Sequence, residues 1–143
     1  MGKFLEAARI VLVSAVFLGG CQAIQDPELE LGYWQLKTLD GASVDTAPGE
    51  PRPEILFDSG PPQRVSGFNG CNRFAGAYVL AGVNVEFRAL STTRMACEPA
   101  AMELEQRFSR ALDATRGWRM VDAELELLDT YGQPLARFEL KQP

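Results

Sequence analysis

The chain has 143 residues and a formal net charge of −5, from 14 Lys and Arg against 19 Asp and Glu, and it contains no histidine. Its length suits one domain with a real core, and no run of basic residues interleaved with aromatic ones suggests that it binds nucleic acid. The absence of histidine excludes serine–histidine and cysteine–histidine nucleophiles, and no phosphate-binding, dinucleotide or calcium motif is present, so we expect neither a metal nor a cofactor.

The first 20 residues have the pattern of a cleaved export signal. Lys3 and Arg9 lie in a short charged region, and the apolar stretch 10–18 is too short to span a bilayer as a stable helix. This stretch ends in Leu18-Gly19-Gly20-Cys21, which resembles the lipobox of bacterial lipoproteins, in which the cysteine receives a diacylglyceryl group. We therefore predict that residues 1–20 are a lipoprotein signal peptide and that Cys21 is lipidated. The alternative is an ordinary secretory signal with a chance cysteine at its end.

Residues 21–30 are polar, contain Pro27 and are expected to form a short lipidated tether to a domain that spans residues 31–141. A negatively charged domain is repelled by anionic lipid, so the predicted membrane attachment is the lipid anchor at Cys21. Gln22 stands where lipoproteins retained in the inner membrane commonly carry aspartate. By this resemblance, we expect a bacterial cell-envelope protein on the outer membrane, facing the periplasm.

Alternation of apolar and polar residues predicts β-strands through most of the domain. The predicted strands are 32–39, 54–58, 74–80, 83–90, 118–121, 124–128 and 134–140. The clearest alternation lies in 83–90, and it predicts a core face made of Val83, Val85, Phe87 and Ala89. The strands 74–80 and 83–90 are expected to form a hairpin about Ala81-Gly82.

The strand 124–128 carries two acidic residues on one face. Leu125 and Leu127 are expected to face the core, which places Glu124 and Glu126 together on a solvated face. A catalytic carboxylate pair of the kind used in glycoside hydrolysis is the less favoured interpretation.

Residues 99–115 form the one convincing helix of the sequence. Its apolar stripe comprises Ala101, Leu104, Phe108, Ala111 and Leu112 at helical spacing. Pro99 suits the first turn, and Glu103 and Arg107 are spaced for an i,i+4 ion pair. Strands separated by turns, with one amphipathic helix among them, predict a mainly β (α+β) fold: a small, curled, antiparallel or barrel-like sheet with the helix packed on it.

The glycine- and asparagine-rich stretch 65–76 is expected to be an irregular, sharply turning part of the sheet. It contains Cys71, and the segment 91–97 contains Cys97, the one other cysteine that remains if Cys21 is lipidated. An even pair in an exported protein favours a disulfide. Closing a separation of this length would contribute about 3.5 kcal/mol to stability. Two separately buried thiols are the alternative.

Two motifs around these cysteines resemble the META domain, the family of HslJ-type heat-shock lipoproteins. They are Gly70-Cys71-Asn72-Arg73-Phe74-Ala75-Gly76-Ala77-Tyr78 and Thr93-Arg94-Met95-Ala96-Cys97. The resemblance extends over residues 31–141. It implies a small antiparallel, barrel-like sheet with a helix, and a disulfide between the cysteines of the two motifs. It also implies a role in envelope stress, drug tolerance, secretion or motility, without an assigned biochemical activity.

Four polar residues next to the cysteines are the candidate partner-binding residues: Asn72, Arg73, Thr93 and Arg94. An arginine here could bind a carboxylate or phosphate through two hydrogen bonds. The favoured alternative is structural, with the arginines paired inside the protein to an acidic residue such as Glu98 or Glu105.

Three functions remain open at this point. The leading hypothesis is a non-enzymatic envelope lipoprotein whose domain binds another envelope component, a protein, in stress or drug tolerance or in envelope maintenance. The alternative is a lipocalin-like carrier or sensor of a small apolar ligand, and the third is a hydrolase that uses carboxylates alone. A carrier would need a cavity in the barrel, and the aromatic residues expected to line it are Trp34, Phe57, Phe87 and Phe138. A filled barrel with an exposed apolar or edge-strand patch would favour partner binding.

Overall fold

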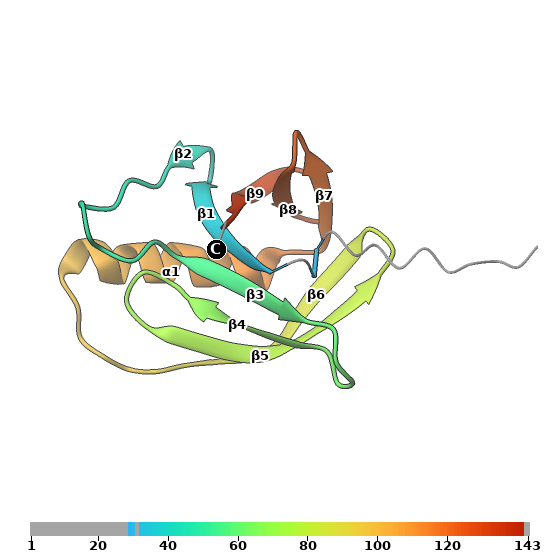
Figure 1. The fold of residues 1–143 in the computed structure, drawn as a ribbon, viewed down its shortest axis with the longest axis horizontal. Helices are drawn as coiled ribbons and strands as arrows, with labels where there is room; N and C mark the ends of the chain where they lie inside the picture. Colours follow the sequence, from blue (N-terminus) through green and yellow to red (C-terminus); the bar gives the residue numbers. More distant parts are fainter. Residues whose placement is uncertain (1–28, 31, 142–143) are drawn as a thin grey trace, which may run out of the picture.

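A computed structural model describes residues 29–30 and 32–141, which contain nine β-strands and one α-helix (Figure 1). The elements are β1 Tyr33–Leu39, β2 Ala42–Ser43, β3 Glu54–Asp58, β4 Arg64–Phe68, β5 Arg73–Ala81, β6 Asn84–Thr92, α1 Pro99–Ala114, β7 Gly117–Val121, β8 Glu124–Leu128 and β9 Pro134–Leu140. Cys21 lies outside the described residues. No helix in the described part of the chain is long and apolar enough to cross a membrane.

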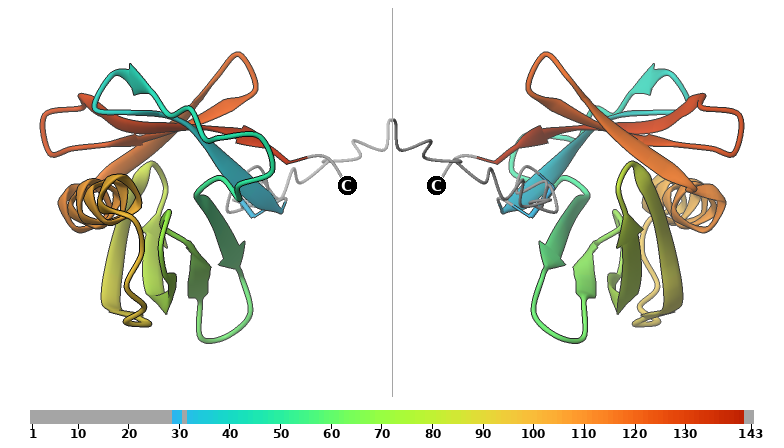
Figure 2. Two further views of the ribbon diagram at one scale, coloured as in Figure 1. Left: turned by 90° about the vertical axis from the view of Figure 1, so that its left-hand side faces the viewer. Right: turned by 90° about the vertical axis from the view of Figure 1, so that its right-hand side faces the viewer.

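The strands form a single antiparallel sheet that closes on itself. Their order is β2-β1-β3-β4-β5-β6-β7-β8-β9, and an additional pairing of β1 with β9 completes a ring (Figure 2). The ring is weakest between β6 and β7, which are in register at a single pair, Asn84 and Gly117. α1 packs against β1, β6 and β9. The predicted mainly β, barrel-like fold with one packed helix is confirmed.

Aromatic side chains fill the interior of the ring. Phe57 packs edge-on against Tyr78, with 5.2 Å between the ring centroids. The ring centroid of Phe108, on α1, lies 6.0 Å from those of Phe74 and Phe138. In the carrier hypothesis, four aromatic residues are expected to line a cavity inside the barrel. All four, Trp34, Phe57, Phe87 and Phe138, are at most 9% exposed and belong to one continuous hydrophobic core.

The residues before β1 pack against the barrel. Leu29 is fully buried, and its carbonyl accepts a hydrogen bond from Trp34 Nε1 at 2.8 Å. The Glu30 carboxylate accepts a hydrogen bond from the hydroxyl of Tyr78. Burial, followed by this carboxylate, raises the pKa of the Tyr78 phenol. The packed domain therefore includes Leu29 and Glu30, which the sequence assigned to the tether.

Helix α1 begins and ends close to its predicted limits. Pro99 occupies its first turn, and the preceding residue makes no side-chain capping bond. The buried face comprises Phe108, Ala111 and Leu112. The expected pair of Glu103 with Arg107 is not observed. Arg107 instead reaches β1, where it binds the Asp40 carboxylate and the Leu39 carbonyl, each at 3.2 Å from Nη2.

The predicted core face of 83–90 is correct at its centre and wrong at its ends. Val85 and Phe87 are buried, whereas Val83 is 65% exposed. Val83 belongs to the turn before β6, not to the strand. Ala89 is exposed and has φ +50°, close to a register shift between β5 and β6. The bulge breaks the two-residue alternation, so the pattern no longer predicts the buried face.

The predicted solvated face of β8 is also wrong at one position. Glu126 is 1% exposed, because Arg119 of β7 and Arg137 of β9 lie directly beside it in the register. Arg119 Nε and Arg137 Nε donate to its carboxylate at 2.6 and 2.9 Å. Burial opposes ionisation, but the hydrogen bonds and charges of the two arginines outweigh it and hold the pKa of Glu126 below its ordinary value.

Candidate functional site

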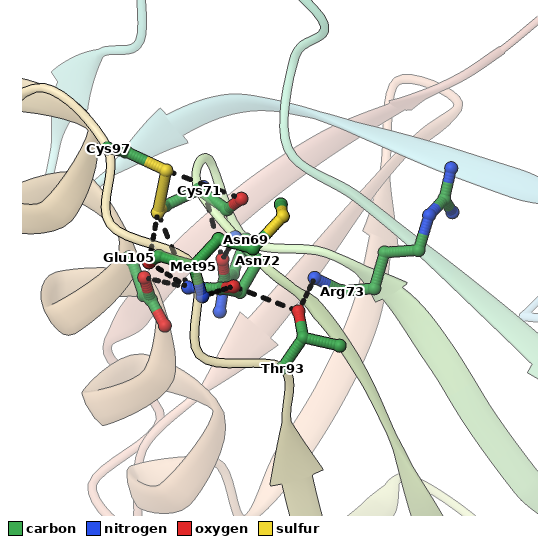
Figure 3. The surroundings of a disulfide bond; sticks show 8 residues. All are labelled: Asn69, Cys71, Asn72, Arg73, Thr93, Met95, Cys97 and Glu105. Carbon is green, nitrogen blue, oxygen red and sulfur yellow. Dashed lines mark hydrogen bonds between the residues drawn. A yellow bond between two sulfur atoms is a disulfide. The ribbon is translucent and has the colours of Figure 1, made fainter.

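A disulfide joins the two cysteine motifs, as the sequence predicted. Cys71 and Cys97 are bonded with an S–S distance of 2.03 Å and a Cα–Cα distance of 5.9 Å. Cys71 lies in the turn before β5, and Cys97 lies in the segment 93–98 that connects β6 to α1. We call the residues around this bond the disulfide cluster: Asn69, Cys71, Asn72, Thr93, Met95, Cys97 and Glu105 (Figure 3).

Asn69 shapes the turn that carries Cys71. Its side-chain oxygen accepts hydrogen bonds from the backbone N–H groups of Cys71 and Asn72, at 3.2 and 2.7 Å. Among the described residues, Asn69 Nδ2 is the one buried side-chain nitrogen or oxygen without a hydrogen-bond partner. Gly70 has φ +108°, and a Cβ atom there would lie 3.0 Å from Leu104 of α1. The turn therefore requires glycine for both its conformation and its contact with the helix.

Asn72 connects three parts of the disulfide cluster through its side chain. Its Oδ1 accepts hydrogen bonds from the Thr93 hydroxyl at 2.9 Å and from the Met95 N–H at 2.8 Å. Its Nδ2 donates to Glu105 Oε2 at 2.9 Å and to the Met95 carbonyl at 3.3 Å. The side chain is 3% exposed. Asn72 is thus a structural residue of the cluster, and a partner could not reach it without displacing these contacts.

Thr93 holds the segment 93–98 to the start of β5. Its N–H donates to the Arg73 carbonyl at 3.0 Å, and its hydroxyl oxygen accepts from the Arg73 N–H at 3.2 Å. These bonds extend the β5–β6 ladder by one residue beyond its last strand pair, Phe74 with Thr92. The backbone of Arg73 is therefore fixed, while its side chain extends away from the disulfide (Figure 3).

The structure brings the four predicted residues together. Asn72 and Thr93 hold the disulfide cluster in place, whereas the two arginines lie at the surface. The side chains of Arg73 and Arg94 are exposed, and neither makes an ion pair with any described residue. The expected internal pairing of these arginines with Glu98 or Glu105 is not observed. Glu105 binds Asn72 instead.

Met95 is a surface residue that sequence reasoning missed. Its side chain is 62% exposed, although both its N–H and its carbonyl are bound by Asn72. The sequence contains a usable signal, because Met95 sits inside the second cysteine motif with an arginine beside it. An exposed apolar side chain on a fixed backbone, with a free arginine on either side, is a favourable arrangement for binding a partner.

Two surface hollows lie on either side of Thr93 and Met95. The loop pocket, about 660 Å³, lies between the loop 46–52 and the outer face of the sheet, and Arg73 lines it. The β6–α1 groove, about 610 Å³, lies between residues 92–96 and the helix, and Arg94 lines it. Thr93 and Met95 line both hollows. None of the four interior aromatics considered as walls of a carrier cavity lines either one.

The described residues form no metal-binding group, and basic side chains bind the acidic pair on β8. They contain no group of three or more His, Cys, Asp or Glu side chains that could hold a metal ion. Glu124 and Glu126 lie on one face of β8, but Lys37 binds the first and two arginines bind the second. A general acid needs a proton to donate, and the lowered pKa of Glu126 opposes that role.

Comparisons with known proteins identify the family from a family model and the fold from two solved structures. The META domain model matches residues 27–142. Two solution structures determined by NMR are similar to this chain, each with a TM-score of 0.62. One is 26% identical, and the match covers 79% of this chain and 92% of that one. The other, from Burkholderia xenovorans, is 27% identical, with coverage of 80% and 85%. Comparison with curated proteins finds no match.

Proposed function

The chain belongs to the META domain family, and from that premise we propose that it is an exported lipoprotein, anchored by a lipid on Cys21, whose domain binds a protein of the cell envelope. In this proposal the domain is a binding module and not an enzyme. Its role lies in stress or drug tolerance or in envelope maintenance, and its location is the periplasmic face of the outer membrane.

One observation carries the binding role: Met95, 62% exposed, lines one hollow with Arg73 and the other with Arg94, on a backbone that the disulfide cluster holds in place. A preorganised surface loses little conformational entropy on binding, so more of its contact energy contributes to affinity. Arginine and exposed apolar side chains are typical centres of protein interfaces. Packing of the hydrophobic core does not explain an exposed methionine next to two unpaired arginines.

The proposed anchor fits the dimensions of the domain. The chain between Cys21 and Leu29, a buried residue of the domain, contains eight peptide units. Fully extended, this stretch reaches at most about 30 Å at 3.3–3.6 Å per residue. Leu29 would therefore stay within about 30 Å of the anchored cysteine, and the domain would stay near the membrane.

The carrier hypothesis receives less support than the binding hypothesis. Its ligand would occupy the interior of the barrel, where Trp34, Phe57, Phe87 and Phe138 pack together. A ligand of about 300 Å³ or more would have to displace these side chains, and opening a packed core costs several kcal/mol. We therefore retain partner binding as the proposed function.

The binding role can be tested in intact cells with a photo-crosslinking amino acid at Ala96, which is exposed and next to Met95. We expect a crosslinked envelope protein from this position and none from a matched position at Thr130, in the exposed β8–β9 loop. Equal crosslinking from both positions, or none from Ala96, would contradict the proposal. Mass spectrometry of the same wild-type protein should detect acyl mass on Cys21, and Cys21→Ser should accumulate as an unprocessed precursor.

A further inference from the structure

The β6–α1 groove differs from the loop pocket in having two unpaired cations, since Arg52 and Lys141 of the loop pocket are bound in ion pairs with Glu139 and Glu54. Arg94 and Arg110 line it, both are exposed, and neither makes an ion pair with a described residue. Glu105 is the one carboxylate among the groove residues, and it accepts a hydrogen bond from Asn72. The groove is therefore a locally cationic site on a chain whose net charge is −5. Such a site attracts an acidic partner and disfavours a basic one.

The groove also offers apolar contacts between its two arginines. Met95 on one wall is 62% exposed, and Met102 on the helix is 40% exposed. Unbranched thioether side chains adapt their shape to different apolar partners. The volume of about 610 Å³ lies within the range of protein ligand sites, roughly 300–1,000 Å³.

The position of the groove, between the end of β6 and α1, favours an extended partner segment. β6 joins β7 at Asn84 and Gly117, and Val85 donates its N–H to the Arg116 carbonyl at 3.2 Å. Beyond this point, no described strand pairs with β6 on that side, and α1 lies beside the strand (Figure 2). Thr92, at the end of β6, is the one residue of this strand that lines the groove, so a partner segment lying between residues 92–96 and α1 would continue from the end of the strand.

From these observations we infer that the β6–α1 groove binds an extended, acidic segment of the partner protein, one that carries apolar residues among its carboxylates. Arg94 and Arg110 bind the carboxylates, and Met95 and Met102 contact the apolar side chains. This inference rests on the proposed function and names the chemistry of the partner at that surface. It makes the groove the principal contact with the partner, and not the loop pocket on the other side of Thr93.

The test uses the full-length lipidated protein with a photo-crosslinking amino acid at one of two exposed positions. Gln106 lies in the groove, and Glu50 lies in the loop pocket. Mass spectrometry of the crosslinked peptides identifies the partner segment itself. We expect crosslinks from Gln106 to a segment in which Asp and Glu outnumber Lys and Arg, with at least two apolar residues.

Charge reversal provides the second measurement. Arg94→Glu combined with Arg110→Glu should lower the crosslinking yield from Gln106 by about tenfold or more, because each arginine then repels a carboxylate. Arg64→Glu is the matched control: Arg64 is exposed on β4, lies outside the groove and should leave the yield unchanged. An unchanged unfolding midpoint in urea shows that both variants remain folded.

The outcomes separate this inference from the proposed function. Crosslinks from Ala96 and Glu50 but not from Gln106 would overturn the inference and leave partner binding intact. A neutral or basic crosslinked segment, or a yield unaffected by charge reversal, would also overturn it. No crosslinked protein from Ala96, Gln106 or Glu50 would overturn both.

Discussion

Asn72 Nδ2 donates a hydrogen bond to Glu105 Oε2 at 2.9 Å and thereby ties helix α1 to the turn before β5. The same amide binds both backbone polar groups of Met95. One buried side chain therefore fixes the backbone of an exposed one, and the order of the proposed binding surface depends on this buried residue.

Removal of the Asn72 amide should destabilise the domain. In Asn72→Ala, the Met95 N–H, the Thr93 hydroxyl and Glu105 lose their partners. We expect the free energy of unfolding to fall by about 2–4 kcal/mol, because part-buried polar groups are left unsatisfied. Urea unfolding monitored by tryptophan fluorescence measures the loss. Thr92→Ala, at an exposed end of β6, is the control and should change stability by less than about 0.5 kcal/mol.

Removal of the disulfide should have a comparable effect. The bond joins residues 26 positions apart, and we expect Cys71→Ser with Cys97→Ser to lose about 2–5 kcal/mol. Non-reducing peptide mapping of the wild type should recover the linked fragments. A double serine variant as stable as the wild type would show that packing and the Asn72 bonds alone hold the two motifs together.

The ion pairs of Glu126 should make stability depend on acid pH. Its folded-state pKa is lowered, so its contribution is complete above the unfolded value of about 4.3 and is lost as pH falls through the folded value. At pH 7, Glu126→Gln should cost about 1–2 kcal/mol, less than for a fully buried pair, because solvent screens the half-exposed arginines.

The variant should also lose less stability than the wild type as pH falls below the unfolded value of about 4.3, because only the wild type has a carboxylate at this position to protonate. Glu86→Gln is the control, since the Glu86–Arg88 pair is exposed on both sides. Parallel stability curves for the wild type and Glu126→Gln over this range would contradict the assigned pKa shift.

Two glycines with positive φ should respond differently to alanine. Gly41 has φ +78°, and a Cβ atom there would meet no other atom within 4 Å, so Gly41→Ala should cost only backbone strain, about 1 kcal/mol. Gly70→Ala adds a contact of 3.0 Å with the Leu104 side chain and should cost about 1–3 kcal/mol more, because that packed side chain must shift by a few tenths of an ångström. Equal losses for the two variants would show that the turn and the helix are not closely packed.

Local alternation predicted most of the fold. The predicted strands 54–58, 124–128 and 134–140 agree residue for residue with β3, β8 and β9. The same reasoning failed at Ala89, because a bulge depends on the pairing with β5 and leaves no periodic signal on β6. The two-residue β2 was missed, as no period can be read from so short a segment.

The chemistry of individual positions was harder to predict than the strands. Glu126 looked solvated because its neighbours along the chain are those of a surface strand, whereas Arg119 and Arg137 reach it from other strands. Asn72 and Arg73 are adjacent in sequence, yet one is buried and the other exposed. That difference follows from the start of β5 at Arg73 and from the contact with α1, and neither is visible in the motif alone.

The central claim is that Arg73, Met95 and Arg94 contact a partner and are not required for folding. The most direct measurement compares the wild type with the triple variant Arg73→Ala, Met95→Ala, Arg94→Ala for urea unfolding and for crosslinking yield from Ala96. We expect each substitution to change the free energy of unfolding by less than about 0.5 kcal/mol, since all three side chains are exposed, and the crosslink to disappear. A folded triple variant that still captures the partner at the wild-type yield would contradict the account.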